Sequence, residues 1–135
     1  MVTFAATTPA LPSADVARAI AFYSEKLGFE PLHVEDGFAV LRRDDVTVNL
    51  WGATDDSWHA RSDWERPIVS GAESFIAGTA SCRVEVSGVD DLYARCADEG
   101  IVHPNGHIKN TWWGTREFGV LDPDGNLIGF YENRR

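Results

Sequence analysis

Four histidines and two cysteines are the residues of this sequence best suited to metal or nucleophile chemistry. His103 and His107 are four residues apart, but the proline and glycine between them prevent the helix that would bring both imidazoles to one face. His33 falls in a predicted strand and His59 in a long loop. No Ser-His-Asp order, Walker-type loop or dinucleotide fingerprint is present. These residues therefore predict neither a metal cluster nor a catalytic triad.

The two cysteines predict no disulfide framework. Cys82 is expected on a strand and Cys96 on a helix. In a cytosolic chain both thiols stay reduced, and both residues are then small apolar side chains.

Five tryptophans in 135 residues are too many for all of them to be core residues. Trp112 and Trp113 are adjacent, and neighbouring residues of a strand point to opposite faces, so at least one should be exposed. The same alternation puts Asn49 and Trp51 on one face of a strand at residues 46–51. A groove with a few polar groups among aromatic walls suits a flat ligand. These four residues are candidate ligand-binding residues.

The first half of the chain is predicted to form a strand, a helix and three further strands. Ser13 can cap the helix with Asp15 in its first turn, and Gly28 ends it. Apolar residues recur at helical spacing at positions 16, 20, 23 and 27. Strands are expected at residues 3–9, 32–34, 38–41 and 46–51, with turns at 36–37 and 44–45.

The second half repeats that order, which suggests an internal duplication. Ser87 can cap a helix whose apolar face includes Cys96, and Gly100 ends it as Gly28 ends the first helix. Strands are expected at residues 80–86, near Ile101, at 115–121 and at 127–132, with a turn at 122–125.

We expect a single domain over residues 1–135, with one module at about 1–52 and a second at about 79–135. The connecting loop, about 53–78, holds Trp58 and Trp64. A loop of this length is expected to form part of a binding wall or a subunit contact, and the alternative is a flap that only covers the sheet.

Two stretches of the sequence are similar to a known superfamily. Residues 11–29 (LPSADVARAIAFYSEKLGF) and 113–130 (WGTREFGVLDPDGNLIGF) resemble the opening and closing motifs of the glyoxalase, bleomycin-resistance and extradiol-dioxygenase superfamily. A Trp-Gly pair, then Arg-Glu-Phe, then Asp-Pro-x-Gly-Asn, together with Phe38 after an acidic turn, resembles its bleomycin-binding branch. The resemblance covers nearly the whole chain except residues 52–78.

The resemblance implies an α+β fold in which two βαβββ modules form a curved mixed sheet, shaped as an open cup. It also implies a homodimer with two grooves between the subunits and an exchanged first strand. Pro9 stands at the position of the crossover, although a proline at the end of a strand is common in any case.

In the metal-dependent members of the superfamily, His, Gln and Glu ligands project from the first and last strands of each module. The matching positions here fall near Thr8, Cys82 and Gly129, which cannot supply such a ligand set. The resemblance therefore implies a protein without catalytic residues, metal or cofactor, which is not an enzyme. It would sequester a bleomycin-family glycopeptide, and a metal such as copper would arrive only with the drug.

The branch also implies the remaining ligand-binding residues. Phe38 and Trp113 would sandwich the drug's flat rings from opposite subunits, and Arg116 belongs to the matched motif. Each such stacking contact contributes roughly 0.5–1.5 kcal/mol beyond burial.

The formal net charge of −9 and the pI near 4.7 argue against nucleic acid as a partner. The negative charge would attract a cationic drug, or it serves solubility alone. The candidates for an acidic rim are Asp36, Asp44, Asp45, Asp55, Asp56 and Asp63. No apolar run is long enough for a membrane span and the first residues do not resemble a signal peptide, so a cytoplasmic location is expected.

Two other functions remain open. The chain could bind another planar aromatic antibiotic or metabolite, because one fold serves many functions. It could also be a metal-dependent, glyoxalase-like lyase, isomerase or thiol transferase, which the missing ligands oppose.

Overall fold

The computed structural model describes residues 1–53, 78 and 80–134 as two successive units of one strand, one helix and three strands. The first unit consists of β1 (Ala10–Ser13), α1 (Val16–Leu27), β2 (Glu30–Glu35), β3 (Phe38–Arg43) and β4 (Val46–Gly52). The second consists of β5 (Ser81–Glu85), α2 (Val89–Asp98), β6 (Lys109–Asn110), β7 (Thr115–Leu121) and β8 (Leu127–Asn133). Most of the connecting loop, with Trp58, His59 and Trp64, lies outside the described residues, so its predicted role is not tested.

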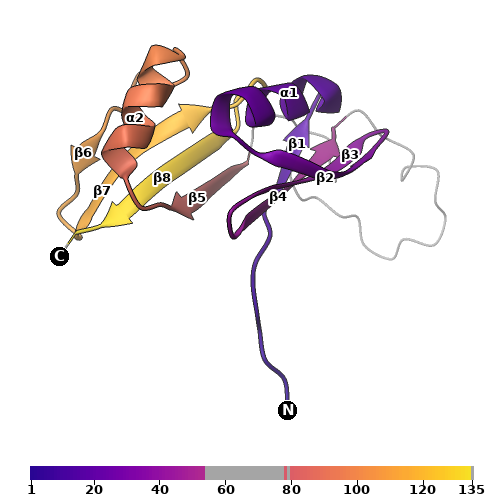
Figure 1. Ribbon diagram of the computed structural model, residues 1–135, viewed down its shortest axis with the longest axis horizontal. Coiled ribbons are helices and arrows are strands. Elements are labelled where there is room, and N and C mark those ends of the chain that lie inside the picture. The colour runs from indigo at the N-terminus through magenta and orange to yellow at the C-terminus, as the bar shows by residue number, and fades with distance from the viewer. Residues whose placement is uncertain (54–77, 79, 135) are drawn as a thin grey trace.

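Each unit forms its own four-stranded mixed sheet. The strand orders are β1-β4-β3-β2 and β5-β8-β7-β6, and in each sheet the first pair is parallel and the others are antiparallel. Figure 1 shows α1 and α2 packed on their sheets from the same side of the molecule. The identical order confirms the α+β fold of two βαβββ modules. We call the face of each sheet that points away from its helix the open face.

The ends of the helices are set by residues other than the predicted serine caps. Asp15, not Ser13, is the N-cap of α1, and its Oδ1 accepts a hydrogen bond from the backbone N–H of Arg18 at 3.0 Å. At α2, Gly88 is the N-cap without a side-chain bond, so the prediction for Ser87 was wrong. The Glu132 carboxylate on β8 instead accepts bonds from the N–H groups of Gly88 and Val89, each at 3.1 Å.

The predicted first strand at residues 3–9 is also wrong, because β1 begins at Ala10. The Pro9 carbonyl still accepts a bond from Asn49 N–H at 2.9 Å. Pro9 has no N–H to continue the ladder, and residues 1–8 leave the sheet as an exposed segment (Figure 1).

The strand expected near Ile101 is reduced to a single bridge between Val102 and Val120. Pro104, two residues further on, cannot donate to a ladder, and the regular pairing resumes only at β6.

The turn at residues 122–126 joins the two modules through buried hydrogen bonds. The Tyr23 hydroxyl of α1 donates to Asp122 Oδ2 at 2.8 Å, and Asn126 Nδ2 donates to the Pro12 carbonyl at 2.7 Å. Burial, and secondly the charge of Asp122, raises the pKa of Tyr23 well above its ordinary value, so the hydroxyl keeps its proton. The sheets are therefore fixed to one another at this turn.

Candidate functional site

Phe38 and Trp51 form an aromatic cluster on the open face of the first module. They are cross-strand partners on β3 and β4, with ring centroids 5.2 Å apart and planes tilted by 38°. The His33 and Phe38 rings are arranged edge to face, with their centroids 6.3 Å apart. Asn49 precedes Trp51 by two residues and shares its face, whereas Val48 and Leu50 are buried on the other side, as predicted. The structure thus brings Phe38, Asn49 and Trp51 together.

Trp112 and Trp113 form a second aromatic site at the tip of the β6–β7 hairpin. Their side chains are 91% and 50% exposed, and their rings meet edge to face at 5.4 Å. Below them the Thr115 N–H donates to Thr111 Oγ1 at 3.0 Å, which closes the turn. The prediction that at least one tryptophan is exposed is confirmed. Large aromatic rings exposed side by side are typical of surfaces that bind a partner or a ligand.

The two aromatic sites do not contact one another within the described residues. The Phe38 ring contacts the rings of Trp51 and His33, and the rings of Trp112 and Trp113 contact each other. A sandwich of one ligand between Phe38 and Trp113 of opposite subunits stays a prediction.

Arg116 lies apart from the aromatic residues, on the helix side of β7. Its Nε and Nη2 both donate to Asp90 Oδ1, at 3.0 and 2.9 Å, and its Nη1 donates to Asn110 Oδ1 at 3.0 Å. The hydrogen bond from Arg116 lowers the pKa of Asp90, which sits in the first turn of α2. In this position the guanidinium stabilises the helix start and does not face the open side.

The charged residues on the open face of the second module include Arg83 and Glu117, which were not predicted. Arg83 Nη2 lies 2.7 Å from Glu117 Oε2, and its guanidinium carbon lies 4.3 Å from the centre of the Tyr131 ring. The Thr115 hydroxyl donates to the same Glu117 oxygen at 2.8 Å. The signal in the sequence was the alternation of β5 and β7, which places both charges opposite the buried Val84 and Phe118.

The positions matched to metal ligands offer no donor set. Thr8 lies in the exposed first segment, Gly129 has no side chain, and burial raises the pKa of the Cys82 thiol. His103 Nδ1 accepts a bond from Asn105 N–H at 2.9 Å, and His107 Nδ1 lies 3.2 Å from the Tyr93 hydroxyl. Among the residues placed in the structure, no three His, Cys, Asp or Glu side chains gather to hold an ion.

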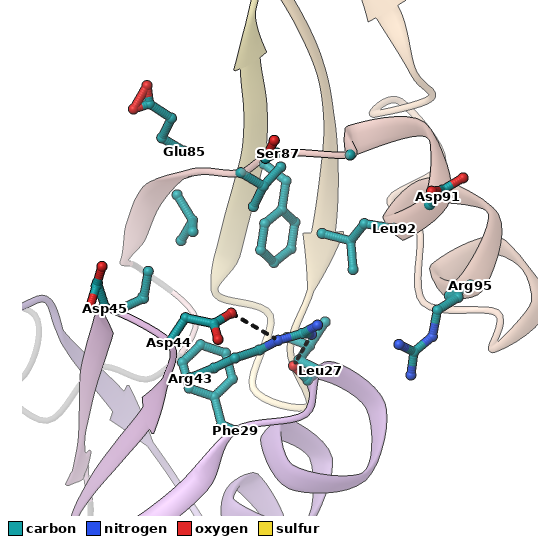
Figure 2. Close-up of a pocket in the computed structure, with 15 residues that line it drawn as sticks. Leu27, Phe29, Arg43, Asp44, Asp45, Glu85, Ser87, Asp91, Leu92 and Arg95 are labelled. Carbon is teal, nitrogen blue, oxygen red and sulfur yellow. Dashed lines mark hydrogen bonds and ion pairs between the residues drawn. The ribbon is translucent and has the colours of Figure 1, made fainter.

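A cavity of about 550 Å³ lies where the two modules meet, on the helix side (Figure 2). Its apolar part includes Leu27, Phe29 and Leu92, and its rim carries charged side chains of both signs. Arg43 crosses it and donates to the Leu27 carbonyl at 2.8 Å. The cavity contains neither aromatic site, and two predicted rim residues, Asp44 and Asp45, line it instead of the open face.

Of the four remaining acidic rim candidates, Asp36 is the one that the structure describes. Asp36 lies in the turn between β2 and β3, next to Phe38. Asp55, Asp56 and Asp63 fall outside the described residues.

Within the part of the chain that is described, neither helix is long and apolar enough to cross a membrane.

Three comparisons relate this fold to known proteins. A bleomycin resistance protein of Geobacillus stearothermophilus is 53% identical over 124 residues, covering 92% of this chain and 93% of that protein. A bleomycin-binding protein of Streptomyces verticillus, solved with copper(II)-bleomycin, is 25% identical with a TM-score of 0.70, covering 96% and 97% of the two chains. A lactoylglutathione lyase of Agrobacterium tumefaciens has the same fold, at 22% identity and a TM-score of 0.71 over 95% and 92% of the chains.

The similarity extends over both modules and includes the two motifs that carry the resemblance. Residues 5–130 match the family described as the Glyoxalase/Bleomycin resistance protein/Dioxygenase superfamily. The chain belongs to this superfamily.

Proposed function

We propose that this protein binds a bleomycin-type antibiotic and holds it without modifying it. The observation that carries the proposal is the exposed pair Trp112 and Trp113, of which Trp113 is the residue that the resemblance implies as a stacking partner of the drug. The relatives at 53% and 25% identity are a bleomycin resistance protein and a bleomycin-binding protein, which supports the same ligand. Offset stacking on such rings favours a flat aromatic group.

The proposed binding unit is a homodimer. The aromatic sites of one chain lie on different sheets without contact, and a second copy would bring Phe38 of one chain opposite Trp113 of the other. Residues 1–8 are exposed, with Val2 and Phe4 among the most exposed apolar side chains. The backbone bonds to β4 begin at Pro9, directly after this segment. Exchange of this segment between subunits would cover those side chains.

We also propose that the protein performs no reaction on the drug. The residues matched to metal ligands supply no donor set, so the metal in the complex would be the one chelated by the antibiotic. The charge of −9 would attract a cationic glycopeptide. Sequestration in the cytoplasm, where the free thiols Cys82 and Cys96 stay reduced, would keep the drug from DNA.

The experiment is a titration of the purified protein with copper-loaded bleomycin, followed by tryptophan fluorescence and by calorimetry. The expected result is a submicromolar dissociation constant with about one drug per chain. A chain that sediments as a monomer at micromolar concentration contradicts the groove between subunits. No binding at tens of micromolar (roughly −6 kcal/mol or weaker) contradicts the proposed ligand.

A second ligand class is supported by the surface itself. Trp112 is almost fully exposed, and stacking on an indole does not depend on the identity of a flat partner. Another planar antibiotic or metabolite would then bind where bleomycin fails. A metal-dependent lyase would instead require stoichiometric metal in the purified protein.

A further inference from the structure

A hollow lies on the open face of the second module, over the middle of β7 and β8. Gly119 and Gly129 are cross-strand partners there, so the face carries no side chain at its centre. The cavity above them measures about 420 Å³. Its walls include Ser81, Arg83, His103, Glu117 and Leu127.

The glycine at position 129 is not explained by the fold. Its φ is not in the positive range that favours glycine, and among the described residues a Cβ atom there would meet nothing closer than Arg83 Cγ at 3.7 Å, an ordinary contact. Glycine in a strand interior costs stability and often marks a place where a ligand comes close to the backbone. Space for a ligand is therefore the physical reason that remains for Gly129.

The partner glycine, Gly119, differs in this respect. A Cβ on Gly119 would come within 3.1 Å of Leu127 Cδ1. The neighbouring loop also reaches this glycine, because Gly119 N–H donates to the Gly106 carbonyl at 2.9 Å and His103 N–H donates to the Gly119 carbonyl at 2.8 Å. Packing inside the chain therefore accounts for Gly119, whereas it does not account for Gly129.

The walls of the hollow offer a fixed donor beside a fixed acceptor. The Arg83 guanidinium is held by Glu117 Oε2 at 2.7 Å and by the Tyr131 ring, and Thr115 anchors the same Glu117 oxygen. In the described part of the chain, Glu117 Oε1 accepts no hydrogen bond, and the guanidinium keeps N–H groups beyond the one that bonds Glu117. A planar group with a donor next to an acceptor can bond to both at once.

We propose that the hollow over Gly129 is a binding subsite for a planar polar group, of which a primary carboxamide is the simplest example. The amide N–H₂ would donate to Glu117 Oε1 and its carbonyl would accept from Arg83, while the ring or chain behind it lies on the flat backbone at Gly129. For the whole ligand this inference rests on the proposed function: the tryptophans bind the flat rings of the antibiotic and the hollow binds an amide of its peptide part.

The first test uses nicotinamide as the probe, followed by amide chemical shifts of the labelled protein. In the wild type, shifts at residues 83, 117 and 129 should saturate at a dissociation constant on the order of 1 mM, as expected for so small a ligand. N,N-dimethylnicotinamide lacks the donor and should bind about tenfold more weakly. The Gly129→Val variant fills the hollow and should show no saturating shifts there. Equal shifts in this variant, or equal binding of the two probes, overturn the inference.

The control variant is Asn133→Val, which places the same valine on the same face of the same strand, outside the hollow. It should bind nicotinamide as the wild type does. The thermal midpoint of Gly129→Val should equal or exceed that of the wild type, because valine favours strands and the added Cβ has room. Loss of nicotinamide binding in the control as well would also overturn the inference.

The second test uses copper-loaded bleomycin with the same variants. Gly129→Val should bind the drug at least about tenfold more weakly than Asn133→Val. Equal affinities overturn the inference and leave the proposed function intact. Absence of drug binding in the wild type overturns the proposed function, and the nicotinamide titration then decides the subsite by itself.

Discussion

Replacing Asn126 with alanine should remove the tie between the two modules. The Asn126 side chain is 0% exposed and makes three hydrogen bonds that the change deletes. Its Nδ2 donates to the Pro12 carbonyl at 2.7 Å and to Asp122 Oδ2 at 3.0 Å, and its Oδ1 accepts from Ala80 N–H at 3.2 Å. At about 1 kcal/mol for each bond, and more where a buried partner is left unpaired, the free energy of unfolding should fall by about 3–4 kcal/mol.

The assay is urea unfolding of wild type and variant, supported by thermal melts, in which this loss corresponds to roughly 10–15 °C. The matched control is Asn133→Ala, because Asn133 is exposed and its amide makes one bond, to Glu85 Oε1 at 2.8 Å. The control should lose less than about 0.5 kcal/mol. If Asn126→Ala loses no more than the control, the turn does not hold the modules together and the reasoning fails.

Three further predictions concern single side chains. Trp113→Ala should weaken binding of copper-loaded bleomycin more than tenfold, with an unchanged circular dichroism spectrum. The reason is that the drug would bury the exposed half of the indole, about 100 Å², which contributes roughly 2.5 kcal/mol. Unchanged affinity would remove Trp113 from the site. Burial raises the pKa of Cys96 to about 11, so at pH 8 iodoacetamide should modify the Cys96 thiol only after unfolding, and rapid modification of the native protein would contradict its burial. The bond from Arg116 lowers the pKa of Asp90, so the stabilisation from this ion pair is present above the ordinary carboxyl pKa and is lost as the pH falls through the lowered value. The difference in urea midpoint between wild type and Asp90→Asn should therefore vanish on acidification. A difference that persists at pH 2 would be evidence against a stabilising role of the ion pair.

Both helices and most of the strands could be predicted from local patterns, because alternation and glycine stops act within a few residues. The segment at 115–121 and the left-handed Gly28 at the end of α1 are found where the sequence predicts them. The cap of α2 could not be predicted in this way, since Glu132 reaches Gly88 from a strand 44 residues away. The residues around position 87 favoured Ser87 as the cap, because local spacing does not show which distant carboxylate the fold brings to the start of the helix.

The candidate site divides along the same line. Alternation alone put Asn49 and Trp51 on one face, and the adjacency of Trp112 and Trp113 predicted exposure. Arg116 was selected because it belongs to a motif that is continuous in sequence. In the strand, however, successive side chains point to opposite faces, and the Arg116 guanidinium lies on the helix side, where it bonds to Asp90. Motif membership does not tell which face a residue occupies.

The turn at residues 122–126 has a consequence for how the two halves of the chain have diverged. Its counterpart in the first module, between β3 and β4, is only the pair Asp44 and Asp45, and among the described residues it makes no comparable set of buried bonds. The longer turn receives the Tyr23 hydroxyl and holds the end of β1, so the last hairpin closes on the first strand. The repeats are therefore no longer interchangeable: neither half can complete its packing alone, and we expect the chain to unfold in a single cooperative transition.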